Sequence, residues 1–255
     1  MTGLGDFTRQ AAAYARSRPS YPPALVEQLI AYVGVGKGDA VADIGAGTGI
    51  FSSMLADAGL RVTAVEPNAA MREQASSIGA GDGVIWHDGS FEQTHLAAGT
   101  FRWVVAAQAF HWADPPRALP EMKRILAPGG RFTVLWNNRL NSESPVLAFT
   151  DGLMRGMVPE LDHAYRDVDW EQVLASTGDF AHVVHHSVRH EQTYPRDRYV
   201  DLWRSHHRLT ETAGPGRLQR FLDELERWLT EHAMNEVSVP YLCRAWTGIA
   251  TPVAS

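Results

Sequence analysis

Three acidic residues stand where apolar runs of the sequence end, and each could bind a polar ligand. Asp43 lies near the end of the first run, Glu66 directly follows the second, and Asp88 follows the third. Short apolar runs that alternate with helical segments predict parallel strands, whose carboxyl ends form the ligand-binding edge of such a sheet. We therefore expect these carboxylates to lie along one edge of a single site.

The segment VADIGAGTGIF places Gly45, Gly47 and Gly49 at alternate positions directly after the first run. Ordering a glycine on folding costs more backbone entropy than ordering any other residue, and an ordinary turn does not need three glycines. We therefore expect that a ligand lies close to the backbone of this turn. The dinucleotide pattern G-x-G-x-x-G would need a third glycine where Ile50 stands. Asp43, just before the loop, would repel a diphosphate and suits a ligand that carries positive charge.

S-adenosylmethionine meets this requirement, because it has an adenosine, no phosphate, a sulfonium cation and a free ammonium. Glu66, about 20 residues after the first glycine, is placed to accept hydrogen bonds from both ribose hydroxyls. Glu66 alone would suit NAD equally well, so the choice between the two cofactors depends on Asp43.

With these motifs in view, the sequence resembles class I S-adenosylmethionine-dependent methyltransferases, in the small-molecule branch similar to trans-aconitate methyltransferases. VADIGAGTG resembles the first family motif and AVEPNAAM the second, while HDGSF is similar to the adenine-contacting stretch. Four further stretches resemble the family: VVAAQAFHWAD, LAPGGRF, WNNR and the N-terminal YARSRPSYP. These motifs fall between Tyr14 and Arg139, and the C-terminal third resembles the family only loosely.

The resemblance implies a set of cofactor contacts and S-adenosylhomocysteine as the product. Asp43 would steady the ammonium end, Glu66 would hold the ribose and Asp88 would accept from the adenine amino group. The N-terminal segment would fold over the cofactor as a lid. The implied cofactor residues are Tyr14, Arg18, Asp43, Gly45, Ala46, Gly47, Glu66, Pro67, Met71, Asp88, Gly89, Phe91, Ala107 and Gln108.

His111 is the best candidate for a catalytic base, because it follows the fourth run and histidine titrates near neutrality. Its alternative role is to shape the local turn, and both interpretations stay open. Tyr14 is a second catalytic candidate, since aromatic faces attract a sulfonium. A base is needed only when the acceptor must lose a proton early, because alignment and desolvation supply much of the catalysis of methyl transfer.

Four further residues are weaker candidates for contacts with the acceptor. Arg139 could anchor an acidic acceptor, because guanidinium binds carboxylate bidentately. Trp112 is more often a packing residue than a substrate platform. The four candidates are Trp112, Asn138, Arg139 and Trp203.

The histidine-rich stretch HVVHHSVRH raises the question of a metal site. His182, His186 and His190 would share one face of a strand, but four residues along a strand span about 13 Å. A single ion with bonds near about 2.1 Å cannot join them, so we expect no metal and a polar face on an outer strand.

Composition narrows the class of protein further. The chain has 255 residues, a net charge of -6 and no basic run, which argues against nucleic acid as a partner. Its only cysteine, Cys243, fits a reducing compartment, and neither a signal peptide nor a membrane span is evident. We expect a cytoplasmic monomer or homodimer that acts on a small molecule.

The alternating pattern predicts a doubly wound α/β fold, with a mostly parallel, Rossmann-like sheet of seven strands if the last two join it. The final strands are expected over 180–189 and 237–246, and a helix over 6–18. We expect one domain, 1–255, with its cofactor-binding core at 35–139. Residues 1–34 would form the lid, and 140–178 and 195–232 would form helical caps.

Three other functions stay open at this stage. The protein could use S-adenosylmethionine without methylating, for example by cyclising it, if the site has no room for a second molecule. It could bind the cofactor without chemistry, which predicts binding and no turnover. A dehydrogenase is the weakest alternative.

Overall fold

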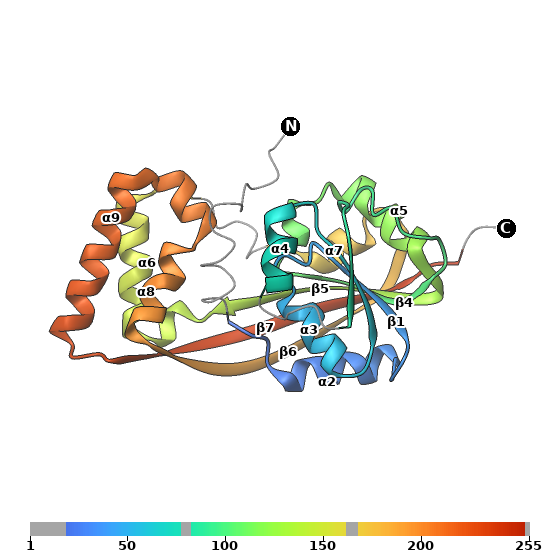
Figure 1. Ribbon diagram of the computed structural model, residues 1–255, viewed down its shortest axis with the longest axis horizontal. Coiled ribbons are helices and arrows are strands. Elements are labelled where there is room, and N and C mark those ends of the chain that lie inside the picture. Colours follow the sequence, from blue (N-terminus) through green and yellow to red (C-terminus); the bar gives the residue numbers. More distant parts are fainter. Residues whose placement is uncertain (1–18, 78–82, 162–167, 253–255) are drawn as a thin grey trace.

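The computed structural model describes residues 19–77, 83–161 and 168–252. The helix expected over residues 6–18 lies outside this part of the chain. Figure 1 shows the described elements, which divide between a sheet with its covering helices and a second group of helices beside it.

Seven strands form one sheet in the order β3-β2-β1-β4-β5-β7-β6, which confirms the predicted mostly parallel, doubly wound architecture. Strands β1 to β5 pair in parallel, and β7 is antiparallel to both β5 and β6. The strands are β1 (Ala40–Ile44), β2 (Arg61–Val65), β3 (Val84–His87), β4 (Phe101–Ala107), β5 (Leu126–Arg139), β6 (Phe180–Pro195) and β7 (Glu236–Ala250).

The helices follow the strands in the order expected for this fold. They are α2 (Pro23–Val33), α3 (Ile50–Asp57), α4 (Ala69–Ser77), α5 (Pro115–Ile125), α6 (Pro145–Met157), α7 (Trp170–Ala175), α8 (Arg196–Arg204) and α9 (His207–Glu231), with short 3-10 helices η1 (Phe110–Trp112) and η2 (Asn141–Glu143).

The sheet is covered on both faces because successive strand residues point to opposite sides and nearly all are apolar. On β4, Trp103 and Val105 pack in one cluster with α2 and α3. Val104 and Ala106 pack in the other cluster, with α5 and α7. This two-sided burial leaves the carboxyl-end edge of the sheet as the place for a ligand.

Strands β5, β6 and β7 run on from the sheet toward the second group of helices (Figure 1). We call this group the second lobe: α6, α8, α9 and the adjoining ends of β6 and β7, which share one apolar cluster. Both final strands are longer than expected. In the added end of β6 exposed residues alternate with less exposed ones, as in a half-covered antiparallel strand. In the added end of β7, Thr247 and Gly248 are buried, and they interrupt the apolar run that would mark a strand.

The long helix α9 contains a break at Gly214, where φ is 67° and ψ is 171°, followed by Pro215. Glycine adopts this conformation without the steric cost of a Cβ, and proline cannot donate to the helix ladder. Helix α9 is therefore two helical segments that meet at a kink.

The segment expected to form the first cap, residues 140–178, is divided between the two parts. Helix α6 belongs to the cluster of the second lobe. Helix α7 instead packs on the sheet, where Trp170 stacks on Trp136 with ring centroids 4.0 Å apart.

Candidate active site

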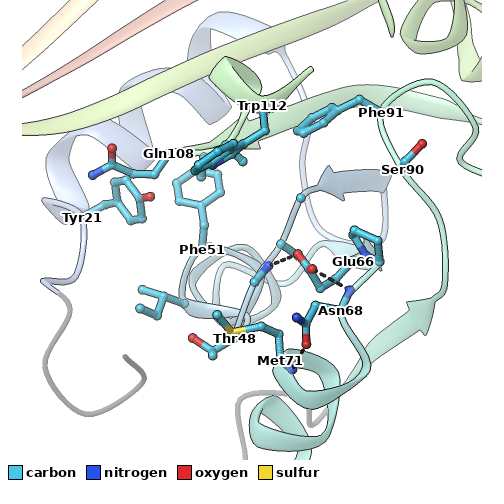
Figure 2. Close-up of a pocket in the computed structure, with 17 residues that line it drawn as sticks. Tyr21, Thr48, Phe51, Glu66, Asn68, Met71, Ser90, Phe91, Gln108 and Trp112 are labelled. Carbon is cyan, nitrogen blue, oxygen red and sulfur yellow. Dashed lines mark hydrogen bonds between the residues drawn. The ribbon is translucent and has the colours of Figure 1, made fainter. Parts of the chain in front are cut away.

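A cavity of about 310 Å³ lies at the carboxyl ends of β1, β2 and β4. Its volume is within the range of small-molecule sites, roughly 300–1,000 Å³. Figure 2 shows Glu66, Asn68 and Met71 on one side and Trp112, Gln108 and Tyr21 on the other. The lining residues are Tyr21, Gly45, Ala46, Gly47, Thr48, Ile50, Phe51, Glu66, Pro67, Asn68, Met71, Ser90, Phe91, Ala107, Gln108, Ala109 and Trp112.

The glycine loop passes directly along this cavity, and two of its glycines are required for different reasons. Both have left-handed backbone angles, with φ of 71° at Gly45 and 58° at Gly47. A Cβ on Gly45 would lie 2.8 Å from side-chain atoms of Ala109 and Phe91, whereas a Cβ on Gly47 would meet nothing within 4 Å. Gly45 thus permits close packing of the loops, and Gly47 leaves open space where its backbone faces the cavity.

Glu66 is the acidic side chain that lines the cavity. Its Oε2 accepts from the backbone N–H of Gly47 and its Oε1 from that of Asn68, each at 2.9 Å (Figure 2). Burial raises the pKa of this carboxyl, and the two backbone donors oppose that rise. The carboxylate is therefore held in one orientation, and its remaining lone pairs are available to hydroxyl groups of a ligand.

Asn68 lines the cavity and also caps α4, because its Oδ1 accepts from the backbone N–H of Met71 at 3.2 Å. Met71, buried on the first turn of that helix, faces the cavity together with Pro67. Phe91 adds an aromatic surface. These side chains form a largely apolar wall beside Glu66, which suits a flat heterocycle next to a sugar.

Asp43, which we expected to steady the ammonium end of the cofactor directly or through water, is buried beneath the glycine loop. This side chain has no exposed surface, lies outside the cavity lining, and accepts from the Ser52 hydroxyl at 2.6 Å. Burial raises its pKa to about 7, and the nearby charge of Glu66 adds to the rise. Its second oxygen, Oδ1, is also buried and has no hydrogen-bond partner among the described residues, so the role expected of Asp43 toward the ammonium end stays a prediction.

Asp88 and Gly89 lie next to the cavity without lining it. Asp88 is largely exposed and pairs with Arg72 at 3.4 Å. A Cβ on Gly89 would lie 2.9 Å from the Thr94 carbonyl oxygen and from Val65, so this glycine is required by packing. The neighbouring Ser90 reaches the cavity instead.

His111 also lies outside the cavity lining, whereas its neighbour Trp112 is at the mouth and about one third exposed. The Trp136 indole N–H donates to His111 Nδ1 at 3.4 Å, which places the ring proton on Nε2. Burial lowers the pKa of His111 to about 4, and Arg208 contributes to the decrease. A neutral, weakly basic ring in this hydrogen bond favours the turn-shaping role over the role of a base.

Two of the candidates for acceptor contacts come together in the second lobe. The Arg139 guanidinium lies over the Trp203 ring, 4.2 Å from its centroid. Neither side chain lines the cavity, and Asn138 does not line it either. Tyr14 and Arg18 lie outside the described residues, so their expected contacts stay predictions.

Several lining residues were not expected from the sequence. Tyr21 and Phe51 meet edge to face, 5.0 Å between ring centroids, and both are almost fully buried. Apolar residues in helical segments indicate core packing, so nothing in their types distinguishes them as site residues. The unexpected residues are Tyr21, Thr48, Ile50, Phe51, Asn68, Ser90 and Ala109.

Within residues 19–77, 83–161 and 168–252, no group of three or more histidine, cysteine or acidic side chains could hold a metal ion. Over the same ranges no helix has the length and apolar character needed to cross a bilayer.

Comparison with known proteins agrees with the fold and the glycine loop. Residues 42–134 match the family described as methyltransferase domain. An uncharacterized methyltransferase of Mycobacterium tuberculosis is 36% identical over 142 residues, 52% of this chain and 53% of that protein. A malonyl-[acyl-carrier protein] O-methyltransferase of Pectobacterium atrosepticum is 35% identical over 132 residues, 51% of each chain. The chain thus spans about half the length of the curated relatives it matches.

The solved structure of a putative type II methyltransferase from Anaeromyxobacter dehalogenans has a TM-score of 0.65 and 25% identity. The match covers 91% of this chain and 97% of that one. The chain therefore has the fold of class I S-adenosylmethionine-dependent methyltransferases. The sequence match to a methyltransferase domain is confined to residues 42–134.

Proposed function

We propose that this protein transfers a methyl group from S-adenosylmethionine to a small-molecule acceptor by direct displacement. The observation that carries the proposal is the Glu66 carboxylate, which two backbone N–H groups fix beside a cavity of about 310 Å³. Fixed in this way, it is placed to receive a pair of vicinal ribose hydroxyls.

The described residues fit the remainder of this cofactor. Pro67, Met71 and Phe91 offer apolar surface for an adenine next to Glu66. At the other side, Ala107 and Gln108 adjoin the glycine loop, where Gly47 leaves open space for a methionine moiety. We keep Asp88, which lies outside the lining but two residues before the lining residue Ser90, as the proposed contact of the adenine amino group at the cavity rim.

The cofactor, when bound, supplies an electrophilic methyl group on a sulfonium. The residues of this chain contribute alignment and exclusion of water, which lower the barrier to a displacement. Tyr21 and Phe51 form a buried aromatic wall and Trp112 lies at the mouth. We propose that His111 does not act as a general base, since it lies outside the cavity lining and its pKa is lowered to about 4.

The acceptor would enter past Trp112, from the side of the second lobe. A small acceptor suits a cavity whose lining comes from residues 21–112 and whose mouth is aromatic. The likeness to an O-methyltransferase supports oxygen as one class of acceptor atom. We further propose one domain with a lid at 1–34, and a cytoplasmic protein without a nucleic acid partner, as a monomer or homodimer.

The experiment is a transfer assay with methyl-labelled S-adenosylmethionine and a fractionated pool of small metabolites. We expect label in a small-molecule product and an equal amount of S-adenosylhomocysteine. Conversion of the cofactor without labelled product would favour a non-methylating enzyme. Tight cofactor binding with no turnover across the pool would contradict the transferase and favour a binding module.

A further inference from the structure

We infer that Asn137 on β5 is a positioning residue that holds the segment Ser20–Tyr21 against the cavity, and that His190 on the outer strand β6 orients its amide. The inference rests on the proposed function, because it concerns the site that would bind the methyl donor. It gives a role to the last histidine of HVVHHSVRH.

The Asn137 side chain is only 6% exposed and uses both ends of its amide. Its Nδ2 donates to the Ser20 carbonyl oxygen at 3.2 Å, and its Oδ1 lies 2.8 Å from His190 Nε2. A carbonyl oxygen only accepts, so the amino group must face Ser20 and the amide oxygen must face His190. His190 Nε2 therefore carries a proton and donates it.

The backbone of the same residue holds a second part of the cavity wall. The Asn137 carbonyl oxygen accepts from Gln108 Nε2 at 3.2 Å. Gln108 has a left-handed backbone with φ of 58°, a conformation that a non-glycine residue adopts only when its surroundings favour it. Asn137 thus joins Gln108 at the end of β4 to the segment that precedes α2.

Both connected segments contribute to the cavity. Gln108 and Tyr21 line it, and Figure 2 shows them on the same side, opposite Glu66. Tyr21 in turn packs edge to face on Phe51. A shift of Ser20 would therefore move an aromatic wall of the proposed cofactor site.

His190 reaches Asn137 across β7, which lies between β5 and β6. Its ring stacks on Tyr241, with centroids 5.2 Å apart and an interplanar angle of 17°. The residue of β7 opposite Asn137 is Cys243, whose small side chain leaves room on this face. The face is the one covered by α2, so this histidine points inward and is not part of a polar outer surface.

The test combines two variants with a matched control. Asn137→Asp keeps the shape but places a carboxylate oxygen against the Ser20 carbonyl oxygen. His190→Phe keeps the stack on Tyr241 and removes the hydrogen bond. His186→Phe, on the same strand and face, keeps a ring beside Tyr32 and touches no residue of this network, so it is the control.

Two readouts follow each variant: hydrogen exchange of the peptide over residues 19–33, and calorimetric affinity for S-adenosylhomocysteine. We expect faster exchange in Asn137→Asp and His190→Phe, with affinity about tenfold weaker in the first, because a buried donor is lost. The control should match wild type in both. Wild-type exchange and affinity in both variants, or equal losses in His186→Phe, would overturn the inference.

The ¹⁵N chemical shifts of His190 in the wild-type protein provide a readout that needs no variant. The Nε2–H tautomer is expected, and the Nδ1–H tautomer would overturn the inference even if Asn137→Asp did not fold. Failure of the wild type to bind S-adenosylhomocysteine would contradict the proposed function. The exchange and tautomer measurements would still decide the role of Asn137.

Discussion

Asp43 near the end of β1 and Glu66 directly after β2 lie on neighbouring strands, yet their surroundings give them different chemistry. Glu66 faces the cavity and accepts two backbone hydrogen bonds. Asp43 is fully buried and receives one hydroxyl donor, from Ser52. The first is a binding group, and the second is an ionisable group enclosed beneath the loop, where its negative charge is disfavoured.

This difference predicts how stability changes with pH. Burial raises the pKa of Asp43 from 3.8 to about 7, so between these values the folded state binds more protons than the unfolded state. The free energy of unfolding therefore falls as pH rises through this window, by up to about 4 kcal/mol from this group. Asp43→Asn removes the loss and should gain stability relative to wild type as pH rises.

Urea unfolding of both proteins at about pH 4 and about pH 8 measures this gain. His111 contributes in the opposite direction, because its pKa is lowered, but that contribution is common to both proteins and cancels in the difference. A stability difference that does not vary with pH would contradict the account of Asp43.

The glycine loop predicts stability losses of different size for two similar substitutions. Gly45→Ala should destabilise the protein by about 2–4 kcal/mol, because the methyl group would meet Ala109 and Phe91 at 2.8 Å. Gly47→Ala should cost about 1 kcal/mol of stability, because alanine disfavours the left-handed backbone of this position. It should also weaken cofactor binding more than tenfold, because the methyl group would enter the open space proposed for the methionine moiety. Thermal unfolding and calorimetry separate the two, and equal stability losses would contradict the assignment.

At the scale of elements, a buried hydrogen-bond chain joins β4, β5 and β7. The Trp103 indole N–H donates to Thr133 Oγ1 at 2.8 Å, and Thr133 Oγ1 lies 2.8 Å from Thr247 Oγ1. All three side chains are fully buried, so each polar atom depends on the others. The chain fixes the parallel part of the sheet to its antiparallel strand.

Thr133→Val, which keeps the shape, should therefore destabilise the protein by about 1–3 kcal/mol, because the indole N–H loses its acceptor. Thr63→Val, at a partly exposed position of β2, is the control and should change the free energy of unfolding by no more than about 0.5 kcal/mol. Equal losses of unfolding free energy in the two variants, measured by urea unfolding, would show that these buried hydrogen bonds do not contribute to stability.

The way each strand and side chain is buried explains which parts of the fold and of the site could be predicted from the sequence. Strands β1 to β5 were predicted because buried parallel strands are continuous apolar runs, whereas the added ends of β6 and β7 have no such run. Glu66 and Gly47 were recognised by type and spacing. Tyr21 and Phe51 were missed because an aromatic residue that lines a site cannot be distinguished from one that packs in the core by its type alone. The complete burial of Asp43 was not predicted, because burial beneath a loop depends on tertiary packing.

At the scale of the whole molecule, the described cavity lining and the second lobe are separate. Every described lining residue lies between Tyr21 and Trp112, whereas the cluster of the second lobe begins at Val146. This division suggests that the sheet binds the methyl donor and the second lobe encloses the acceptor. Arg139 and Trp203 are in contact with each other, and we propose that they lie on the acceptor side.

The separation predicts the outcome of a substitution in the lobe core. Leu225→Ala removes a fully buried side chain of α9 and should lower the free energy of unfolding by about 2–5 kcal/mol. Affinity for S-adenosylhomocysteine, measured well below the melting temperature, should stay within about twofold of wild type, since no lining residue is touched. A large loss of affinity would show that the two parts are energetically coupled.

The central claim is that Glu66 holds a ribose of S-adenosylmethionine, and calorimetric titration with S-adenosylhomocysteine tests it most directly. Wild type should bind one equivalent, and Glu66→Gln should bind at least about tenfold more weakly, because the new amide places a donor against a backbone N–H. Glu73→Gln, at an exposed position of α4 outside the cavity lining, is the control and should bind as wild type does. Absence of binding to wild type, or equal affinity in Glu66→Gln, would contradict the claim.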